Sequence, residues 1–329
     1  MIQVRMYPFH FEPIYEYRLW GGRRLADLLT SPLPGGGPIG EAWLLSDRDG
    51  HSSKVATGPL AGSTIRQLLE QSPGQMLGKL AGRFHRFPVL LKFLDAHDKL
   101  SVQVHPEDGQ REYIPAGESG KTEAWVVLAA EPASQIFAGL KPGTTQDDLR
   151  RTLASGTVAD RLASFTPRVG DAVFLQAGTV HSLSGLVVFE VQENSDVTFR
   201  LYDWDRVDPK TGKSRPLQVE QAIACIDFEQ VAIGPVAPLV EAAAPIRRER
   251  LFHCEHFSVW RHTGHFAFTV GAVGTPRVLV CIVGEGELEH SRINYPVGRG
   301  DVVLLPAEVG ACAFRPRGEV NLLEVALPD

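Results

Sequence analysis

The sequence has few cysteines and no long apolar run, and each shortage excludes a class of protein. No apolar run reaches the roughly 18 residues that a membrane-spanning helix needs, so we expect no membrane span. Residues 1–20 lack a basic stretch followed by an apolar run, so we expect no signal peptide and a cytoplasmic protein. The cysteines form no C-x-x-C pair and fit no zinc-finger spacing, which predicts small buried side chains at Cys225, Cys254, Cys281 and Cys312.

Basic residues are too few to dominate the surface. The chain has 33 Lys and Arg against 39 Asp and Glu, a net charge of −6, which argues against a nucleic-acid partner. Turn residues, in contrast, are plentiful, because 32 Gly and 23 Pro are scattered along the 329 residues. This length fits about two domains of roughly 150 residues each. The many turns favour short strands.

Runs rich in Val, Leu and Ile, bounded by Gly, Pro or Asp, predict a mainly β fold. We expect strands at Val89–Leu94, Leu100–His105, Ala124–Ala129, Ala172–Leu175, Leu186–Gln192, Val278–Val283 and Asp301–Leu305. Apolar residues at helical spacing after a cap-like Ser or Thr predict only a few short helices. These are expected at residues 63–69, at 144–162 with a break at Gly156, and at 218–226.

Two similar segments indicate a repeated fold. Gly170–Ala177 (GDAVFLQA) and Gly300–Ala307 (GDVVLLPA) each join a Gly-Asp turn to an apolar strand. This pattern resembles cupins, so we expect two cupin-like double-stranded β-helix barrels, with a few short helices inserted in the first half. The proline-containing segment 228–245 is interpreted as a linker. It separates a catalytic domain, residues 1–240, from a C-terminal domain, residues 241–329. Aligning the two segments sets Ala311 opposite His181, so the C-terminal domain is expected to bind no metal.

Polar residues in three of the expected strands have the composition of a metal site. Ser101, Gln103 and His105 alternate with apolar residues and therefore share one strand face. Glu123 begins an apolar strand, where a buried carboxylate needs a cation or a metal. His181 follows a third strand. Two histidines and a carboxylate bind a divalent metal and leave positions open for substrate, and Gln103 can add a weaker oxygen ligand.

A second polar stripe lies near residue 200. Asp196, Thr198, Arg200 and Tyr202 alternate, so we expect them on one face of a strand. Arg200 stands between two apolar residues in an aromatic-rich segment. We therefore expect its side chain not to be freely solvated.

Together these blocks are similar to the type I mannose-6-phosphate isomerase family, in its short bacterial form within the cupin superfamily. The blocks are Leu91–Asp95 (LKFLD), Leu100–Pro106 (LSVQVHP), Gly120–Trp125 (GKTEAW), Ala177–His181 (AGTVH) and Asn194–Arg206 (NSDVTFRLYDWDR). The resemblance is good from residue 10 to residue 230 and weak beyond that point.

The resemblance implies an enzyme that interconverts mannose 6-phosphate and fructose 6-phosphate through an enediol. It implies one zinc ion per chain, held by Gln103, His105, Glu123 and His181. Arg200 would be the catalytic arginine, Lys121 a second cation that stabilises negative charge, and Glu190 our candidate for the base that moves the proton. The implied substrate-binding residues are Ser101, Lys92 and Arg206.

Two other interpretations stay open from the sequence. In a cupin oxygenase, two histidines and one carboxylate would hold iron(II), although the amide, lysine and arginine of the neighbouring motifs disfavour this. A non-enzymatic sugar-binding or regulatory cupin would tolerate the loss of a ligand or of Arg200, yet all of them are present. The expected partner is therefore a sugar phosphate, with no nucleic acid and no membrane involved.

Overall fold

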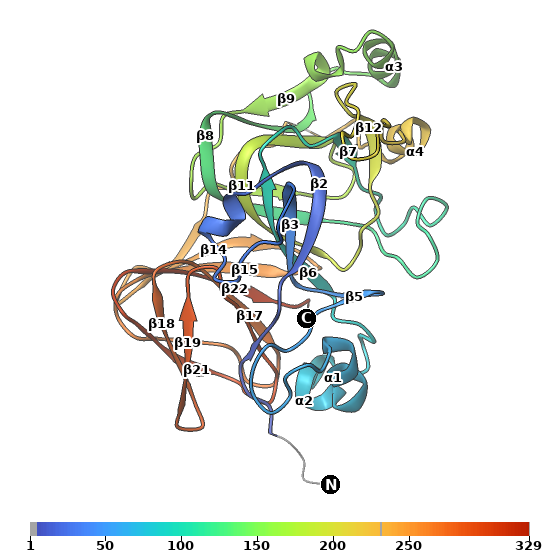
Figure 1. Ribbon diagram of the computed structural model, residues 1–329. Helices are drawn as coiled ribbons and strands as arrows, with labels where there is room; N and C mark the ends of the chain where they lie inside the picture. Colours follow the sequence, from blue (N-terminus) through green and yellow to red (C-terminus); the bar gives the residue numbers. More distant parts are fainter. Residues whose placement is uncertain (1–4, 231, 329) are drawn as a thin grey trace.

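Two curled β regions, one stacked on the other, make up most of the computed structural model, which describes residues 5–230 and 232–328 (Figure 1). Strands far outnumber helices among these residues, so the prediction of a mainly β fold is confirmed. No helix in the described part of the chain combines the length and the apolar character that crossing a membrane requires.

The first β region is a sheet formed by residues upstream of position 203. Its main path runs through β10 (Ala172–Leu175), β8 (Glu123–Leu140), β11 (His181–Glu193), β6 (Val89–Ala96), β2 (Ile14–Gly22) and β3 (Ile39–Leu45). Three further strands lie beside this path: β7 (Val102–Val104), β9 (Leu162–Phe165) and β12 (Phe199–Tyr202). β7 pairs with β11, β12 pairs with β7, and β9 pairs with β8. Because β6 and most of β11 are buried along their length, their polar side chains need partners inside the protein.

The second β region consists of two smaller sheets. One runs in the order β1 (Phe9–His10), β20 (Val302–Leu305), β17 (Arg277–Val283), β22 (Val320–Ala326), β15 (Ser258–Gly264), β14 (Arg247–His253) and β13 (Leu239–Ala242). The other runs in the order β16 (Phe268–Val270), β21 (Cys312–Pro316), β18 (Glu285–His290) and β19 (Ile293–Gly298). Elsewhere a short hairpin joins β4 (Asp47–Arg48) to β5 (His51–Ser52).

The two β regions share strands and core. β1 comes from the N-terminal end of the chain, yet it pairs with β20 in the C-terminal sheet. One hydrophobic cluster also continues from Phe9 and Phe93 to Leu304 and Val325. The division between residues 240 and 241 falls inside β13 and stays a prediction. The closure of each region into a cupin barrel likewise stays a prediction.

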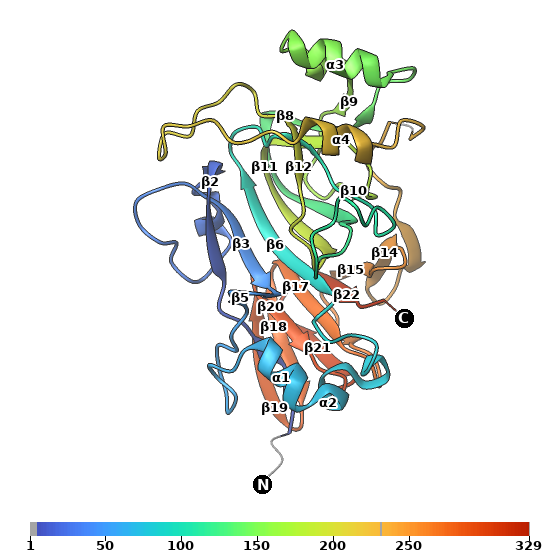
Figure 2. The same ribbon diagram turned by 90° about the vertical axis from the view of Figure 1, so that its right-hand side faces the viewer.

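The helices are short, as predicted, and lie at the two ends of the molecule. They are α1 (Ile65–Gln71), α2 (Pro73–Leu77), α3 (Gln146–Ala154) and α4 (Val219–Cys225), with 3-10 turns at Arg24–Asp27, Gly78–Leu80 and Val158–Arg161. Thr64, rather than Ser63, caps α1 by accepting a hydrogen bond from the Gln67 amide. α3 and α4 lie at the end opposite β19, whereas α1 and α2 lie near the C-terminal sheets (Figures 1 and 2).

The helical segment 144–162 breaks where the sequence predicts. α3 ends at Ala154, and Gly156 adopts a positive φ of 69° before the next 3-10 turn begins. A glycine tolerates this left-handed backbone conformation without the steric cost that other residues meet. The expected strand 100–105 is shorter than predicted, because only Val102–Val104 pair as a strand.

Candidate active site

Three strand ends bring two histidines and a glutamate together in the first sheet. Glu123 begins β8, His181 begins β11 and His105 directly follows β7. Pairing fixes their positions, since His181 lies opposite Gln103 on β7. The three side chains are only 1–2% exposed, and their ligand atoms lie within 4.8 Å of one another. The set predicted from the sequence is therefore assembled in the fold.

Backbone carbonyls fix the orientation of both imidazoles. His105 Nδ1 lies 2.8 Å from Val197 O, and His181 Nδ1 lies 2.9 Å from Thr179 O. Because a carbonyl oxygen only accepts, each Nδ1 carries the proton and each Nε2 keeps its lone pair. Both Nε2 atoms lie 3.3 Å from the carboxylate of Glu123. Two unprotonated imidazole nitrogens beside a carboxylate are the usual arrangement of a metal site.

Burial keeps both histidines in the form that binds a metal. Desolvation, helped by the nearby Lys121 charge, lowers the pKa of His105 to about 3. Desolvation also lowers the pKa of His181. In addition, Oε1 of Glu123 is buried and has no hydrogen-bond partner among the described residues. A divalent cation would give this buried oxygen the partner it lacks, so the donor set fits a metal ion.

Lys121 lies directly beside the three ligand-type residues. Its Nζ is 2.6 Å from Glu123 Oε2 and 3.2 Å from His105 Nε2. Although desolvation favours the neutral amine, the charges of Glu123 and Glu190 outweigh it and raise the pKa of Lys121 above its usual range. Lys121 in turn outweighs the desolvation of Glu123 and holds the pKa of that carboxyl well below its usual range. The site therefore contains a buried ammonium and a buried carboxylate in contact.

Gln103 lies at the edge of this group. Its Oε1 accepts a hydrogen bond from Ser101 Oγ at 3.1 Å, and its Nε2 lies 3.2 Å from His181 Nε2. In this orientation the amide nitrogen, rather than the oxygen, faces the histidine. A half-turn of the amide would exchange the two atoms, since they occupy nearly the same space. The oxygen-ligand role of Gln103 stays a prediction.

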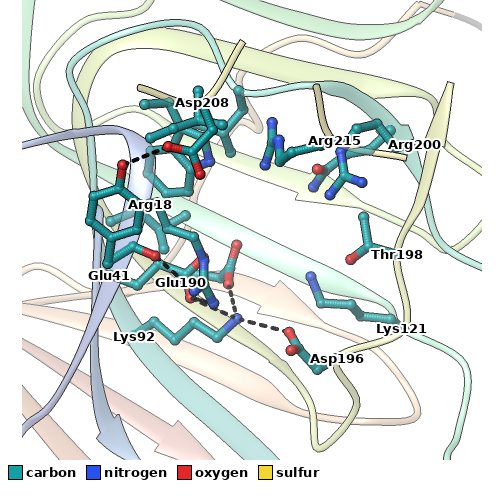
Figure 3. Close-up of a pocket in the computed structure, with 16 residues that line it drawn as sticks. Arg18, Glu41, Lys92, Lys121, Glu190, Asp196, Thr198, Arg200, Asp208 and Arg215 are labelled. Atoms are coloured by element: carbon teal, nitrogen blue, oxygen red, sulfur yellow. Dashed lines mark hydrogen bonds and ion pairs between the residues drawn. The ribbon is translucent and has the colours of Figure 1, made fainter. Parts of the chain in front are cut away.

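A cavity of about 420 Å3 opens beside these residues. Seven residues singled out from the sequence line it, namely Lys92, Gln103, Lys121, Glu190, Asp196, Thr198 and Arg200. Figure 3 shows Lys121, Glu190 and Arg200 around the same space. The volume is in the range typical of small-ligand sites, and the lining is dominated by charged groups. Such a cavity suits a small, polar, charged ligand.

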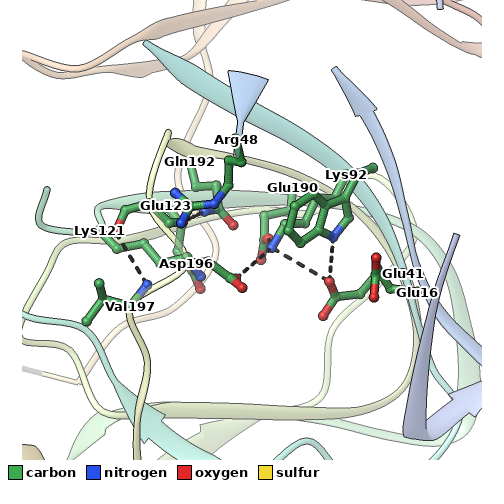
Figure 4. A network of polar contacts seen from close by, with 12 residues as sticks. Glu16, Glu41, Arg48, Lys92, Lys121, Glu123, Glu190, Gln192, Asp196 and Val197 are labelled. Carbon is green, nitrogen blue, oxygen red and sulfur yellow. Dashed lines mark hydrogen bonds and ion pairs between the residues drawn. The ribbon is translucent and has the colours of Figure 1, made fainter. Parts of the chain in front are cut away.

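Lys92 and Glu190 belong to a buried polar network on one wall of the cavity. Lys92 Nζ lies 3.5 Å from Glu190 Oε1 and 3.8 Å from both Glu41 Oε2 and Asp196 Oδ1 (Figure 4). The other Glu190 oxygen accepts a hydrogen bond from Trp125 Nε1 at 2.8 Å. Desolvation raises the pKa of Glu190, whereas Lys92 and Arg18 outweigh it at Glu41 and lower that pKa to about 2. Glu190 and Glu41 therefore differ in basicity.

Arg200 lines the cavity and forms no ion pair with a carboxylate of the described residues. Its Nη1 donates to the Pro216 carbonyl at 2.9 Å, and its buried Nε has no hydrogen-bond partner among the described residues. Desolvation and the neighbouring Arg215 lower its pKa to about 10. The side chain is only partly exposed, as the sequence predicts. A half-buried cation with a free N–H is a natural point of attachment for a negatively charged group.

Ser101 and Arg206 are not among the residues that line the cavity. The Ser101 hydroxyl donates to Gln103, and Arg206 contacts both the Asp203 carboxylate and the Lys99 carbonyl. These contacts occupy the groups that would bind substrate. The substrate-binding role of both residues stays a prediction.

One expectation about the stripe near residue 200 is wrong. Asp196, Thr198 and Arg200 line the cavity, but Tyr202 does not. The register of β12 against β7 shifts between Arg200 and Tyr202, which breaks the alternation of side chains. Tyr202 instead packs in a hydrophobic cluster with Val102 and donates from its hydroxyl to Asp205.

Several lining residues were not identified from the sequence. They are Tyr17, Arg18, Asp208 and Arg215. Tyr17 Oη donates to Asp208 Oδ1 at 3.0 Å, which joins β2 to the loop after β12. Arg18 lies in the middle of β2 between Tyr17 and Leu19, so its place in an alternating strand is the available signal. No pattern in the neighbouring sequence predicts that Arg215 lines the cavity, because its position depends on the path of the loop between β12 and α4.

Comparison with known proteins points to the same family as the sequence motifs do. Residues 9–125 match the family model of the phosphomannose isomerase type I catalytic domain. Mannose-6-phosphate isomerase ManA of Bacillus subtilis is 34% identical over 310 residues, which cover 92% of this chain and 94% of that protein. Mannose-6-phosphate isomerase of Streptococcus mutans is 30% identical over 311 residues, covering 93% and 95%.

Solved structures agree over the whole length. The mannose 6-phosphate isomerase of Bacillus subtilis superposes with a TM-score of 0.89 at 28% identity, covering 97% of this chain and 99% of that one. A mutant phosphomannose isomerase of Salmonella typhimurium, 18% identical, shares the fold with a TM-score of 0.76 over 98% and 100% of the two chains. The chain therefore belongs to the type I phosphomannose isomerase family and is an aldose–ketose isomerase. This membership argues against both the oxygenase and the non-enzymatic interpretation.

Proposed function

We propose that this protein interconverts mannose 6-phosphate and fructose 6-phosphate with one zinc ion bound by His105, Glu123 and His181. The observation that carries the proposal is the pair of imidazole Nε2 atoms, both 3.3 Å from one buried carboxylate. Neutral imidazole and carboxylate are common zinc ligands, and three protein ligands leave room for substrate oxygens. When bound, zinc polarises the carbonyl or hydroxyl oxygens of the sugar and so makes the neighbouring C–H more acidic.

The remaining chemistry is a proton transfer between C2 and C1 of the sugar. We assign the base role to Glu190, as expected from the sequence. It lines the cavity, and the hydrogen bond from Trp125 Nε1 holds one carboxylate oxygen in place. Desolvation raises the pKa of Glu190, which makes it a better proton acceptor than an ordinary glutamate.

Negative charge that develops on the sugar oxygens needs cations nearby. Arg200 and Lys121 both line the cavity, and Arg200 has no competing carboxylate partner among the described residues. We assign the charge-stabilising role to these two side chains. Lys92, which also lines the cavity, is a proposed substrate-binding residue, together with Ser101 and Arg206.

A coupled assay of mannose 6-phosphate conversion tests the proposal. Turnover should require the phosphate, so unphosphorylated mannose should react poorly. Treatment with a chelator should abolish turnover, and zinc should restore it. A chelated protein that keeps full activity would contradict the metal role, and a stronger reaction with another sugar phosphate would contradict the substrate. Because sugar phosphates are charged and do not cross membranes freely, we also place the reaction in the cytoplasm.

A further inference from the structure

A second group of ligand-type side chains lies behind the active site. Asp108, Glu193 and His256 bring their oxygen and nitrogen atoms within 4.8 Å of one another, in a cleft of about 570 Å3. Asp108 comes from the loop after β7 and Glu193 ends β11, whereas His256 comes from the turn between β14 and β15 in the C-terminal half. The cleft therefore lies where the two halves of the chain meet.

Glu193 forms hydrogen bonds with both backbone groups of Thr122. Its Oε1 accepts a hydrogen bond from the Thr122 amide at 2.7 Å, and its own amide donates to the Thr122 carbonyl at 3.1 Å. Its Oε2 lies 3.4 Å from His256 Nδ1. Asp108 fixes the same segment two residues earlier, because its Oδ1 accepts a hydrogen bond from the Gly120 amide at 2.8 Å. We call these contacts of Glu193 and Asp108 with residues 120–122 the clamp. Segment 120–122 is thus fixed by two carboxylates.

The clamped segment carries two residues of the active site. Lys121 and Glu123 flank Thr122, and their side chains meet each other at 2.6 Å on one side of the chain. Alternation therefore directs Thr122 to the other side, toward Glu193. Thr122 Oγ1 also accepts from the Ala177 amide at 3.4 Å, in the turn that leads to His181. A shift of the Thr122 peptide would move both Lys121 and Glu123.

We propose that Glu193, oriented by His256 of the C-terminal half, is a positioning residue that holds Lys121 and Glu123 in their working geometry. Glu193 is only 6% exposed, so its carboxylate depends on protein partners to offset the loss of water. The Thr122 amide supplies one partner and His256 supplies the other. The C-terminal half thereby acts on the active site through His256, without contributing a group to the chemistry.

The contacts favour this clamp over a second metal site. In the first group, Oε1 of Glu123 has no hydrogen-bond partner among the described residues. In the second group, both carboxylates already accept hydrogen bonds from backbone amides. Asp108 is also exposed to water, unlike any member of the first group. A cation would have to compete with bonds that the fold has already made.

The test compares four variants for kcat, KM, zinc affinity by chelator competition, and melting temperature. Glu193→Ala should lower kcat and zinc affinity, each by about 10- to 100-fold, as is typical when support of metal ligands is removed. Glu193→Gln keeps an acceptor for the Thr122 amide and should recover most of the loss. His256→Ala should give a smaller loss in the same direction. His253→Ala, on the same hairpin and bonded to Ser258, is the matched control and should leave all of these unchanged.

Three results would overturn the inference. Glu193→Ala and His256→Ala could lower the melting temperature while kcat and zinc affinity stay at wild-type values, which would make the contact merely structural. His253→Ala could cause the same losses as His256→Ala. Wild-type protein could also bind a second metal equivalent that His256→Ala loses, which would make the group a ligand set. Only the kcat measurement depends on the proposed function. Zinc affinity reports on the clamp even if mannose 6-phosphate is not the substrate.

Discussion

The two β regions differ in how the oxygens of their buried carboxylates are bonded. In the first region, the strands enclose Lys121, Glu123 and Glu190 beside an open cavity. In the second region, the main buried pair is His262 with Glu324, whose Nε2 and Oε2 lie 3.1 Å apart. Glu324 Oε1 also accepts from the Gly271 amide, so both of its oxygens are used internally.

The difference shows which buried charges are available to a ligand. A buried ionised group costs free energy unless partners offset the loss of water. In the second region both oxygens of Glu324 have such partners, although His262 Nδ1 and Arg261 Nε are buried without a hydrogen bond among the described residues. In the first region Glu123 Oε1 and Arg200 Nε remain without one among the described residues. A carboxylate with an unsatisfied oxygen beside two histidines and a cavity indicates a site for metal and substrate, whereas a carboxylate whose two oxygens both have protein partners indicates a structural role.

The largest effect should come from removing the two imidazoles of the first region. We expect His105→Ala/His181→Ala protein to lose its metal to background and to lose turnover by more than about 1000-fold, because Glu123 alone is a weak ligand and the charge stabilisation disappears. Metal analysis and the coupled assay measure the two losses. Retained stoichiometric metal would mean that the site lies elsewhere in the chain.

Replacing Arg200 should separate binding of the metal from the chemistry. Arg200→Lys keeps a positive charge but loses the planar group that can hold two substrate oxygens. We expect unchanged zinc content and a fall in kcat/KM of about 100-fold. Arg315→Lys, an exposed arginine paired with Glu289 in the second region, is the matched control. Near-wild-type kinetics for Arg200→Lys would assign the charge-stabilising role to another residue.

The pH profile should report on Glu190. The base must be ionised to accept a proton, so activity falls as pH decreases through its pKa. Because desolvation raises this pKa, the acid limb of kcat/KM should lie above the usual range of a glutamate. Glu190→Gln should abolish most turnover at every pH while zinc remains bound. An acid limb at or below the ordinary glutamate value would argue against Glu190 as the base.

The smallest effect should come from histidines of the second region. His253→Ala, His262→Ala and His290→Ala should each leave kcat within a few-fold of wild type. His262→Ala should nevertheless lower the melting temperature, because it leaves the buried Glu324 with one partner fewer. A large loss of kcat in one of these variants, with metal content and stability intact, would show that the second region supplies a catalytic group.

The sequence predicts the parts of the site that depend on short motifs. Alternation selects His105 and apolar surroundings select Glu123, because strand period fixes which side chains share a face. His181 is selected by its place after a strand and by the family resemblance. The mainly β fold and the break at Gly156 follow from equally local signals.

Features that depend on tertiary structure were not predictable in this way. The bulge that turns Tyr202 away from the cavity follows from the register of β12 against β7. The pairing of β1 with β20 joins residues almost 300 positions apart. Arg18 and Arg215 reach the cavity from a strand and a loop that the fold brings together. None of these relations has a signature within a short window of sequence.

The most direct test of the account is to measure metal content and turnover on the same sample. The metal is removed with a chelator, zinc is returned in steps, and mannose 6-phosphate conversion is assayed after each step. We predict that activity rises in proportion to bound zinc and stops rising at one equivalent per chain. Full turnover without bound metal, or activity that keeps rising to a second equivalent, would contradict a single metal site at His105, Glu123 and His181.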